Sequence, residues 1–207
     1  MEDNYDDKFK PGNNIKTYNF FCNMITTLKY LKDNNIIHAD LKPENIIIDK
    51  NDDYNLTKFK LCDFGSSIFS HEKISNLPPL PYRAPELIND DYYSFEIDLW
   101  SLGCILWEIL ILDNLLFDDN DEKKVYNKQL QLCSSEYNLL NLIDNKLSFV
   151  NYDDDELFLQ NAKSCELRSI FTKLINISPK ERAELCNFIP IANDSKITTR
   201  RKSSPSY

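Results

Sequence analysis

The stretch His38-Ala39-Asp40-Leu41-Lys42-Pro43-Glu44-Asn45 decides the fold. It places a carboxylate, an ammonium group and an amide in one short loop. The loop precedes an apolar run, Ile46-Ile47-Ile48, whose β-branched side chains predict a short strand. The amide oxygen of Asn45 belongs to the hard oxygen ligands that Mg²⁺ prefers. The octapeptide therefore indicates polar chemistry on a turn that leads into a strand.

The elements around this loop are predicted from hydrophobic periodicity. A helix is expected from Tyr18 to Asn34, because its apolar residues recur at helical spacing. A second strand, Phe59 to Cys62, follows the polar turn Asp49 to Thr57. It runs directly into Asp63-Phe64-Gly65, so a second polar motif follows a strand.

The second half of the chain contains a long apolar helix. Ser66 to Leu80 has the composition of a loop, and Ser94 is a candidate cap for a helix from Phe95 to Leu112. This helix is apolar on nearly all sides, but it is too short to span a bilayer and carries Asp98 and Glu108. We therefore predict a core helix. Further helices are expected at Glu122 to Cys133 and Glu166 to Ile177, separated by the acidic stretch Asn151 to Glu156.

Composition limits the class of protein and its partners. The chain has 207 residues, of which 42% are hydrophobic, so one folded domain is expected. A formal net charge of −9 disfavours nucleic acid as a partner. Six cysteines without a C-x-x-C pair, and an acidic N-terminus without a secretory signal, favour an intracellular protein, cytoplasmic or nuclear. No membrane partner is expected.

Five motifs occur in a fixed order along the chain. They are H-x-D-x-K-x-x-N at 38–45, D-F-G at 63–65, A-P-E at 84–86, D-x-W-S-x-G at 98–103 and P-x-x-R at 179–182. Together they resemble the C-terminal lobe of eukaryotic Ser/Thr protein kinases. Tyr82-Arg83-Ala84-Pro85-Glu86 is most similar to the branch that holds the cyclin-dependent, MAP and dual-specificity Tyr-regulated kinases. Ala39 and the run Lys60 to Ser66 resemble the homeodomain-interacting and pre-mRNA-splicing kinases of that branch.

The resemblance implies a catalytic and nucleotide-binding site for ATP and Mg²⁺. Asp40 would orient the acceptor hydroxyl and accept its proton, and Lys42 would lie against the transferred phosphoryl group. Asn45 and Asp63 would be the metal ligands. Lys42, Asn45, Ile47 and Asp63 would contact the cofactor.

The resemblance also implies structural and specificity roles. His38 would pack on Phe64, Gly65 would give backbone freedom, and Asp98 would hold the loop at 38–45 by hydrogen bonds. Glu86 and Arg182 would form an ion pair. Arg83 would influence substrate choice, with tolerance of a proline after the phosphoacceptor.

The expected fold is α+β: a mainly helical kinase C-lobe over residues 18–190 with a small β-hairpin region around Ile46 to Cys62. We expect a flexible segment at 1–17 and a disordered basic tail at 191–207. No Gly-rich loop and no V-A-x-K strand precede Tyr18, so the N-terminal lobe is expected to be missing from this chain.

Two functions remain open from the sequence. The first is a Ser/Thr kinase acting on protein hydroxyls, with a regulatory partner that the sequence does not identify. The second is a truncated, non-catalytic pseudokinase that binds a partner protein. Two substitutions bear on the choice: Ala39 stands where these kinases usually have Arg, and Pro79 where they have a Ser or Thr that contacts the catalytic Asp and Lys.

Overall fold

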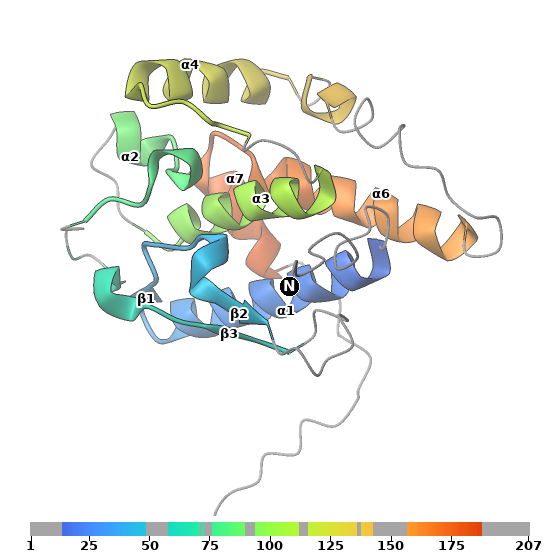
Figure 1. Ribbon diagram of the computed structural model, residues 1–207, viewed down its shortest axis with the longest axis horizontal. Helices are drawn as coiled ribbons and strands as arrows, with labels where there is room; N and C mark the ends of the chain where they lie inside the picture. The colour runs from blue at the N-terminus through green and yellow to red at the C-terminus, as the bar shows by residue number, and fades with distance from the viewer. Residues whose placement is uncertain are drawn as a thin grey trace, which may run out of the picture.

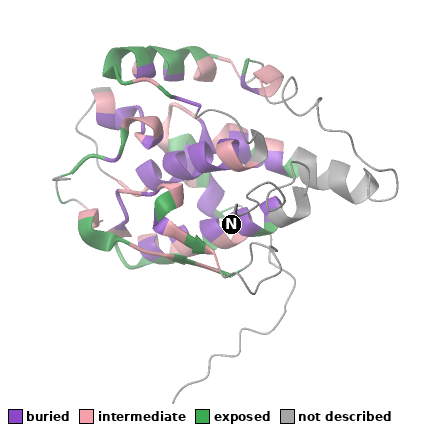
Figure 2. Cartoon of the chain, in the orientation of Figure 1, coloured by how far each residue is buried: buried purple, intermediate pink, exposed green. Residues whose placement is uncertain are grey.

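Helix α3 (Glu96–Ile111) runs through the middle of the molecule (Figure 1). Most of its described side chains are buried, including Trp100 and Leu102 (Figure 2). This confirms the predicted core helix. The expected cap by Ser94 is wrong in its chemistry, because the Ser94 hydroxyl is buried and has no hydrogen-bond partner among the described residues. The Ser94 carbonyl instead accepts a hydrogen bond from the N–H of Ile97 (3.2 Å).

The computed structural model describes residues 14–48, 58–70, 72, 76–89, 94–111, 116–135, 138–142 and 157–187. Residues 1–13 of the expected flexible segment, the turn Asp49 to Thr57, the stretch Asn151 to Glu156 and the tail 191–207 lie outside these residues. The remaining helices are α1 (Asn14–Asp33), α2 (Glu86–Asn89), α4 (Glu122–Cys133), α6 (Leu157–Leu174) and α7 (Pro179–Ala183). Single 3₁₀ turns lie at Pro43–Asn45, Phe64–Ser66, Leu80–Tyr82 and Glu184–Asn187.

Helices α1 and α6 pack against α3 and form the core with it. The buried face of α1 carries the predicted periodic residues, Phe21, Met24, Ile25, Leu28 and Leu31. Gly103 lets α3 lie close to the end of α6, because a Cβ there would lie 2.7 Å from Ile175 Cδ1 and 2.9 Å from Leu174 Cβ. Burial of this apolar surface is the main force that holds the three helices together.

Two small antiparallel sheets stand beside the helices. The predicted hairpin is confirmed: β2 (Ile46–Ile48) pairs with β3 (Phe59–Leu61), with Ile47 opposite Lys60. A second pair, β1 (Ile36–Ile37) with β4 (Ile68–Phe69), was not predicted. Each of these strands has two residues, which is too short for an alternating pattern, and β4 lies inside the segment expected to be a loop.

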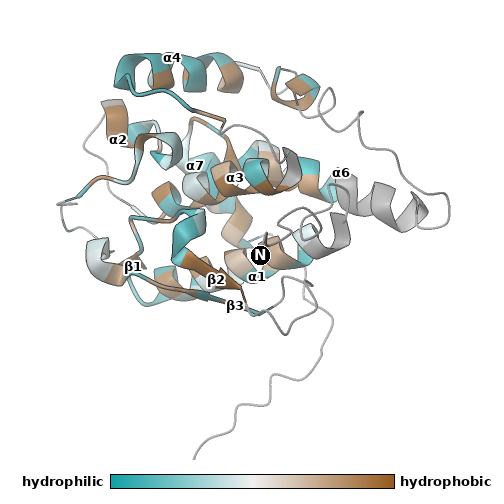
Figure 3. Cartoon of the chain, viewed as in Figure 1, coloured by the Kyte–Doolittle hydropathy of each residue, from teal (hydrophilic) through white to brown (hydrophobic). Residues whose placement is uncertain are grey.

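The outer helices agree in part with their predicted bounds. Helix α4 begins and ends where predicted. Its start is fixed by the Asp121 side chain, which accepts hydrogen bonds from the N–H groups of Lys123 and Lys124. Its outward face is hydrophilic (Figure 3). Helix α1 begins at Asn14, four residues before the predicted start at Tyr18, and α6 begins at Leu157, well before Glu166. Among the described residues, no helix has the length and apolar character needed to cross a membrane.

Candidate active site

The loop from His38 to Asn45 connects β1 to β2 and gathers three polar side chains. Lys42 Nζ lies 2.8 Å from Asp40 Oδ2. Asn45 Nδ2 donates to the same Oδ2 atom (3.0 Å) and to the Asp40 carbonyl (2.8 Å). Asp40 and Lys42 are partly exposed, whereas Asn45 is buried. In this cluster the carboxylate of Asp40 and the ammonium group of Lys42 are accessible to solvent, and the buried amide of Asn45 holds the carboxylate in place.

Asp98 of α3 anchors this loop by hydrogen bonds to its backbone. Its two carboxylate oxygens accept hydrogen bonds from the N–H groups of His38 (2.7 Å) and Ala39 (3.0 Å). Ala39 has a φ of 62°, a left-handed conformation that is unfavourable for a residue with a Cβ. Burial raises the pKa of Asp98, while the two N–H groups and the nearby His38 oppose that rise. The anchoring role predicted for Asp98 has the expected geometry.

Asp63 follows β3 at the start of the second motif. Its φ is 60°, and its Oδ1 accepts a hydrogen bond from the Gly65 N–H (3.3 Å). The left-handed residue is therefore Asp63, whereas Gly65, expected to supply backbone freedom, has no left-handed φ. What Gly65 supplies is space: a Cβ there would lie 3.2 Å from Asp63 Oδ1.

His38 joins the two motifs. Its ring lies 4.8 Å from the Phe64 ring, centroid to centroid, and its Nε2 lies 3.1 Å from the Cys62 carbonyl oxygen. The His38 carbonyl accepts a hydrogen bond from the Ser67 hydroxyl (3.1 Å). The expected packing of His38 on Phe64 is present, and these contacts fix Asp63 relative to the loop.

The donor set fits a magnesium ion held together with phosphates. Asn45 and Asp63 offer an amide oxygen and an exposed carboxylate, and the hydrogen bond from the Cys62 N–H to the Asn45 carbonyl (3.0 Å) places their backbones side by side. The described residues contain no group of three or more His, Cys, Asp or Glu side chains that could hold a metal by themselves. Mg²⁺ is commonly bound through one or two protein carboxylates together with substrate phosphates, and Asp63 is the exposed carboxylate that could serve in that way here.

Lys42 is held in its charged form. Its hydrogen bond to Asp40 raises the pKa of Lys42, and the charges of Asp40, Glu44 and Asp63 act in the same direction. A lysine with three carboxylates nearby stays protonated at neutral pH. The site is thus suited to stabilise negative charge on a bound group.

A second polar cluster lies under the 84–86 segment. Arg182 of α7 is fully buried and forms the predicted ion pair with Glu86. Its Nε donates to the Glu96 carbonyl (3.1 Å) and its Nη1 to the Asn176 carbonyl (2.6 Å). Burial raises the pKa values of Glu86 and Glu96, and the charge of Arg182 lowers both. This cluster is structural and holds α2, α3 and α7 together.

Arg83 lies between the 78–85 segment and α4. Its Nε donates to the Pro78 carbonyl (3.0 Å), and its Nη1 lies 2.5 Å from Glu122 Oε1. Its own carbonyl accepts a hydrogen bond from Gln129 Nε2 (2.9 Å). Arg83 was predicted from the sequence, whereas Glu122 and Gln129 were not. The sequence spacing could have indicated Gln129, because it follows the apolar Val125 by four residues and therefore lies on the same, inward face of α4.

Glu108 is a further residue that was not assigned to the site from the sequence. Burial raises the pKa of Glu108 to about 7, although a hydrogen bond with the Tyr82 side chain acts to lower it.

Ile47, expected to contact the cofactor, is 55% exposed on β2. Such exposure of a large aliphatic side chain leaves a surface on which a flat group can pack.

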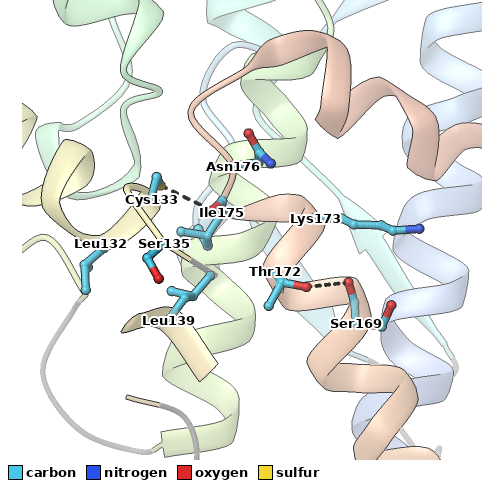
Figure 4. Close-up of a pocket in the computed structure, with 9 residues that line it drawn as sticks. All are labelled: Leu132, Cys133, Ser135, Leu139, Ser169, Thr172, Lys173, Ile175 and Asn176. Atoms are coloured by element: carbon cyan, nitrogen blue, oxygen red, sulfur yellow. Dashed lines mark hydrogen bonds between the residues drawn. The ribbon is translucent and has the colours of Figure 1, made fainter. Parts of the chain in front are cut away.

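A pocket of about 270 Å³ lies elsewhere, between α4 and α6 (Figure 4). Its lining includes Cys133 and Thr172, whose hydroxyl donates to the Ser169 carbonyl (3.0 Å). None of the predicted site residues lines it. The pocket and the Asp40 cluster are therefore separate features.

Comparison with known proteins supports the resemblance. The family model for the protein kinase domain matches residues 5–190. A probable serine/threonine-protein kinase, dyrk2, of Dictyostelium discoideum is 36% identical over 175 residues, which cover 80% of this chain and 18% of that protein. Mitogen-activated protein kinase 13 of Arabidopsis thaliana is 34% identical over 165 residues, covering 77% of this chain and 42% of that protein.

A human relative, dual specificity tyrosine-phosphorylation-regulated kinase 3, is 42% identical over 104 residues, half of this chain. The match covers 17% of that protein. The chain thus spans less than half the length of each of these curated relatives.

Proposed function

Because this chain belongs to the protein kinase family, in the branch of the MAP and dual-specificity Tyr-regulated kinases, we propose that it is the catalytic C-lobe of a Ser/Thr protein kinase. The observation that carries the proposal is the Asp40–Lys42–Asn45 cluster on the loop that Asp98 anchors. The chemistry is transfer of the ATP γ-phosphoryl group to a protein hydroxyl.

Asp40 is the proposed general base, and it also orients the acceptor hydroxyl. Its Oδ2 atom is occupied by Lys42 and Asn45. Its Oδ1 atom accepts no hydrogen bond from the described residues, so it can take one from the acceptor hydroxyl. Two donors on one oxygen fix the carboxylate plane, and this sets the direction from which the hydroxyl approaches.

The remaining residues hold the cofactor. Mg²⁺-ATP, when bound, supplies the phosphoryl group and neutralises the developing charge. Asn45 and Asp63 would bind the metal. Ile47 would pack against the adenine ring of ATP, and Lys42 would turn from Asp40 to a phosphate oxygen. The exposure of Asp63 and Ile47 supports these assignments, since both side chains are accessible to a ligand.

Arg83 supports a preference for proline after the acceptor residue. Its Nε atom already donates to the Pro78 carbonyl, so this carbonyl has less capacity to bind a substrate N–H. A proline at that substrate position has no N–H to leave unpaired. The peptide Ser-Pro would therefore lose less on binding than Ser-Ala.

The non-catalytic alternative is favoured by two substitutions within the motifs themselves. Ala39 and Pro79 replace residues that assist catalysis in the resembling kinases. Under this alternative the lobe binds a partner protein without transferring phosphate.

The test is phosphoryl transfer by the 207-residue chain to a library of Ser peptides, with labelled ATP. Transfer by the wild type that Asp40→Asn abolishes, and that the exposed Asp33→Asn leaves unchanged, supports the enzyme. Asp63→Asn should also weaken stabilisation by Mg²⁺-ATP in a thermal-shift titration, because the metal loses a charged ligand. No transfer and no nucleotide-dependent shift would reject the enzyme for this chain and favour the binding module.

A further inference from the structure

Helix α4 contacts Arg83 at two points. Glu122, in the first turn, pairs with the guanidinium group through Nη1 (2.5 Å). Gln129, two turns later, donates from Nε2 to the Arg83 carbonyl (2.9 Å). One helix therefore holds both the side chain and the backbone of this residue.

Gln129 is a polar residue in an apolar position. It is fully buried, as is Val125 one turn before it. Its Oε1 atom is buried without a hydrogen-bond partner among the described residues. A buried amide with an unpaired oxygen is costly, so an aliphatic side chain would suit burial better. The hydrogen bond to the Arg83 carbonyl is the contact that only the amide provides.

The Glu122 contact is of a different kind. The Glu122 side chain is 59% exposed, whereas that of Arg83 is 13% exposed. An exposed ion pair adds little stability by itself. Its effect is to fix the orientation of the guanidinium group, whose Nε then points at the Pro78 carbonyl (3.0 Å).

We propose that Gln129 and Glu122 are positioning residues for substrate choice: they hold Arg83 so that its Nε occupies the Pro78 carbonyl. The inference rests on the proposed function for its consequence, a preference for proline after the phosphoacceptor. Its geometric part is independent of catalysis. When either contact is lost, Arg83 moves more freely and the Pro78 carbonyl becomes available to a substrate N–H.

The geometric part is tested by amide hydrogen exchange in the full chain. Gln129→Met keeps the volume and removes the donor, and Glu122→Gln removes the charge. Asp119→Asn is the matched control, because Asp119 lies just before α4, where it pairs with Lys124 (4.0 Å) and accepts a hydrogen bond from the Asp121 N–H (3.0 Å), and an asparagine oxygen keeps the second contact. We expect amides within residues 80–88 to exchange about fivefold faster in Gln129→Met, as the loss of one hydrogen bond predicts. Unchanged exchange in both variants would overturn the proposal.

The consequence is tested with two peptides that differ only in Pro or Ala after the acceptor Ser. We expect the ratio of their kcat/KM values to fall at least about threefold in both variants and to stay unchanged in Asp119→Asn. Faster exchange with an unchanged ratio would overturn the role in specificity. If the wild type transfers no phosphate to either peptide, the proposed enzyme function fails, and hydrogen exchange alone then decides whether α4 positions Arg83.

Discussion

Replacing Arg182 with methionine would leave a carboxylate in the core without its cation. Arg182 is fully buried, pairs with the buried Glu86 and donates to the carbonyls of Glu96 and Asn176. Its guanidinium carbon also lies 5.5 Å from the centre of the Trp100 ring. Methionine retains part of the packing and none of the hydrogen bonds.

The expected loss is about 3–5 kcal/mol of unfolding free energy, the usual cost of removing one partner of a buried ion pair. With a urea m-value of roughly 2 kcal/mol/M, the denaturation midpoint falls by roughly 2 M. Fluorescence of the two tryptophans follows the transition, because Trp100 is buried against the altered site. Lys180→Met is the matched control, since Lys180 is an exposed cation on the same helix.

The loss should depend on pH in a defined direction. Burial raises the pKa of Glu86 above its ordinary value of 4.5, and Arg182 is the main group that lowers it. Without Arg182, the pKa of Glu86 rises further in the folded state. A raised folded pKa contributes stability that is present below the unfolded pKa and is lost as pH rises through the folded pKa. The deficit of the variant should therefore be smaller at pH 5 than at pH 8.

A double variant separates charge from packing. Glu86→Gln in the Arg182→Met background removes the unpaired charge, so the double variant should be less destabilised at pH 8 than the sum of the two single losses. A midpoint for Arg182→Met equal to that of Lys180→Met would refute the reasoning. A deficit that grows as pH falls would refute it equally.

Three further predictions concern the core and the anchoring of the loop. Asp98→Asn should cost about 2–3 kcal/mol in urea denaturation, because an amide offers one acceptor to two buried N–H groups; an unchanged midpoint would contradict this. Trp100→Ala and Leu106→Ala should cost about 3–5 and 2–5 kcal/mol through cavities, and wild-type midpoints would show that α3 is not the core. The wild type should gain stability from pH 8 to pH 5 more than Glu108→Gln does, since the pKa of Glu108 is raised to about 7 in the fold; equal gains would exclude this group.

Hydrophobic periodicity predicted best the helices whose apolar residues are buried along the whole helix. Helix α3 lies within one residue of its predicted bounds because its apolar residues face neighbours on all sides. The start of α1 was placed four residues late, because Asn14, Lys16 and Thr17 are polar and the single apolar residue Ile15 does not establish a helical period. The start of α6 was missed because its first residues, Leu157-Phe158-Leu159, form a short apolar run, and periodicity alone does not assign such a run to a helix.

The sequence predicted which polar side chains lie together in the candidate site, but it did not predict the backbone conformations that place them. The order of motifs brought together Asp40, Lys42 and Asn45, and their hydrogen bonds follow from one short loop. The left-handed conformations of Ala39 and Asp63 could not be foreseen, because neither residue favours them as glycine does. Long-range contacts stabilise the first of them, including the bond from the Ala39 N–H to Asp98, 59 residues away.

Buried polar side chains on the helices account for how the loops are held. Asp98 binds the N–H groups of His38 and Ala39, and Ser101, on the next turn of α3, donates to the Tyr82 carbonyl (2.9 Å). Gln129 binds the Arg83 carbonyl from α4 in the same way. An unpaired polar group is expensive in a core, and for each of these three residues a hydrogen bond to a loop backbone offsets part of that cost. A polar residue on the inward face of a helix therefore indicates a contact with a loop, and in α4 the residue that carries this signal is Gln129.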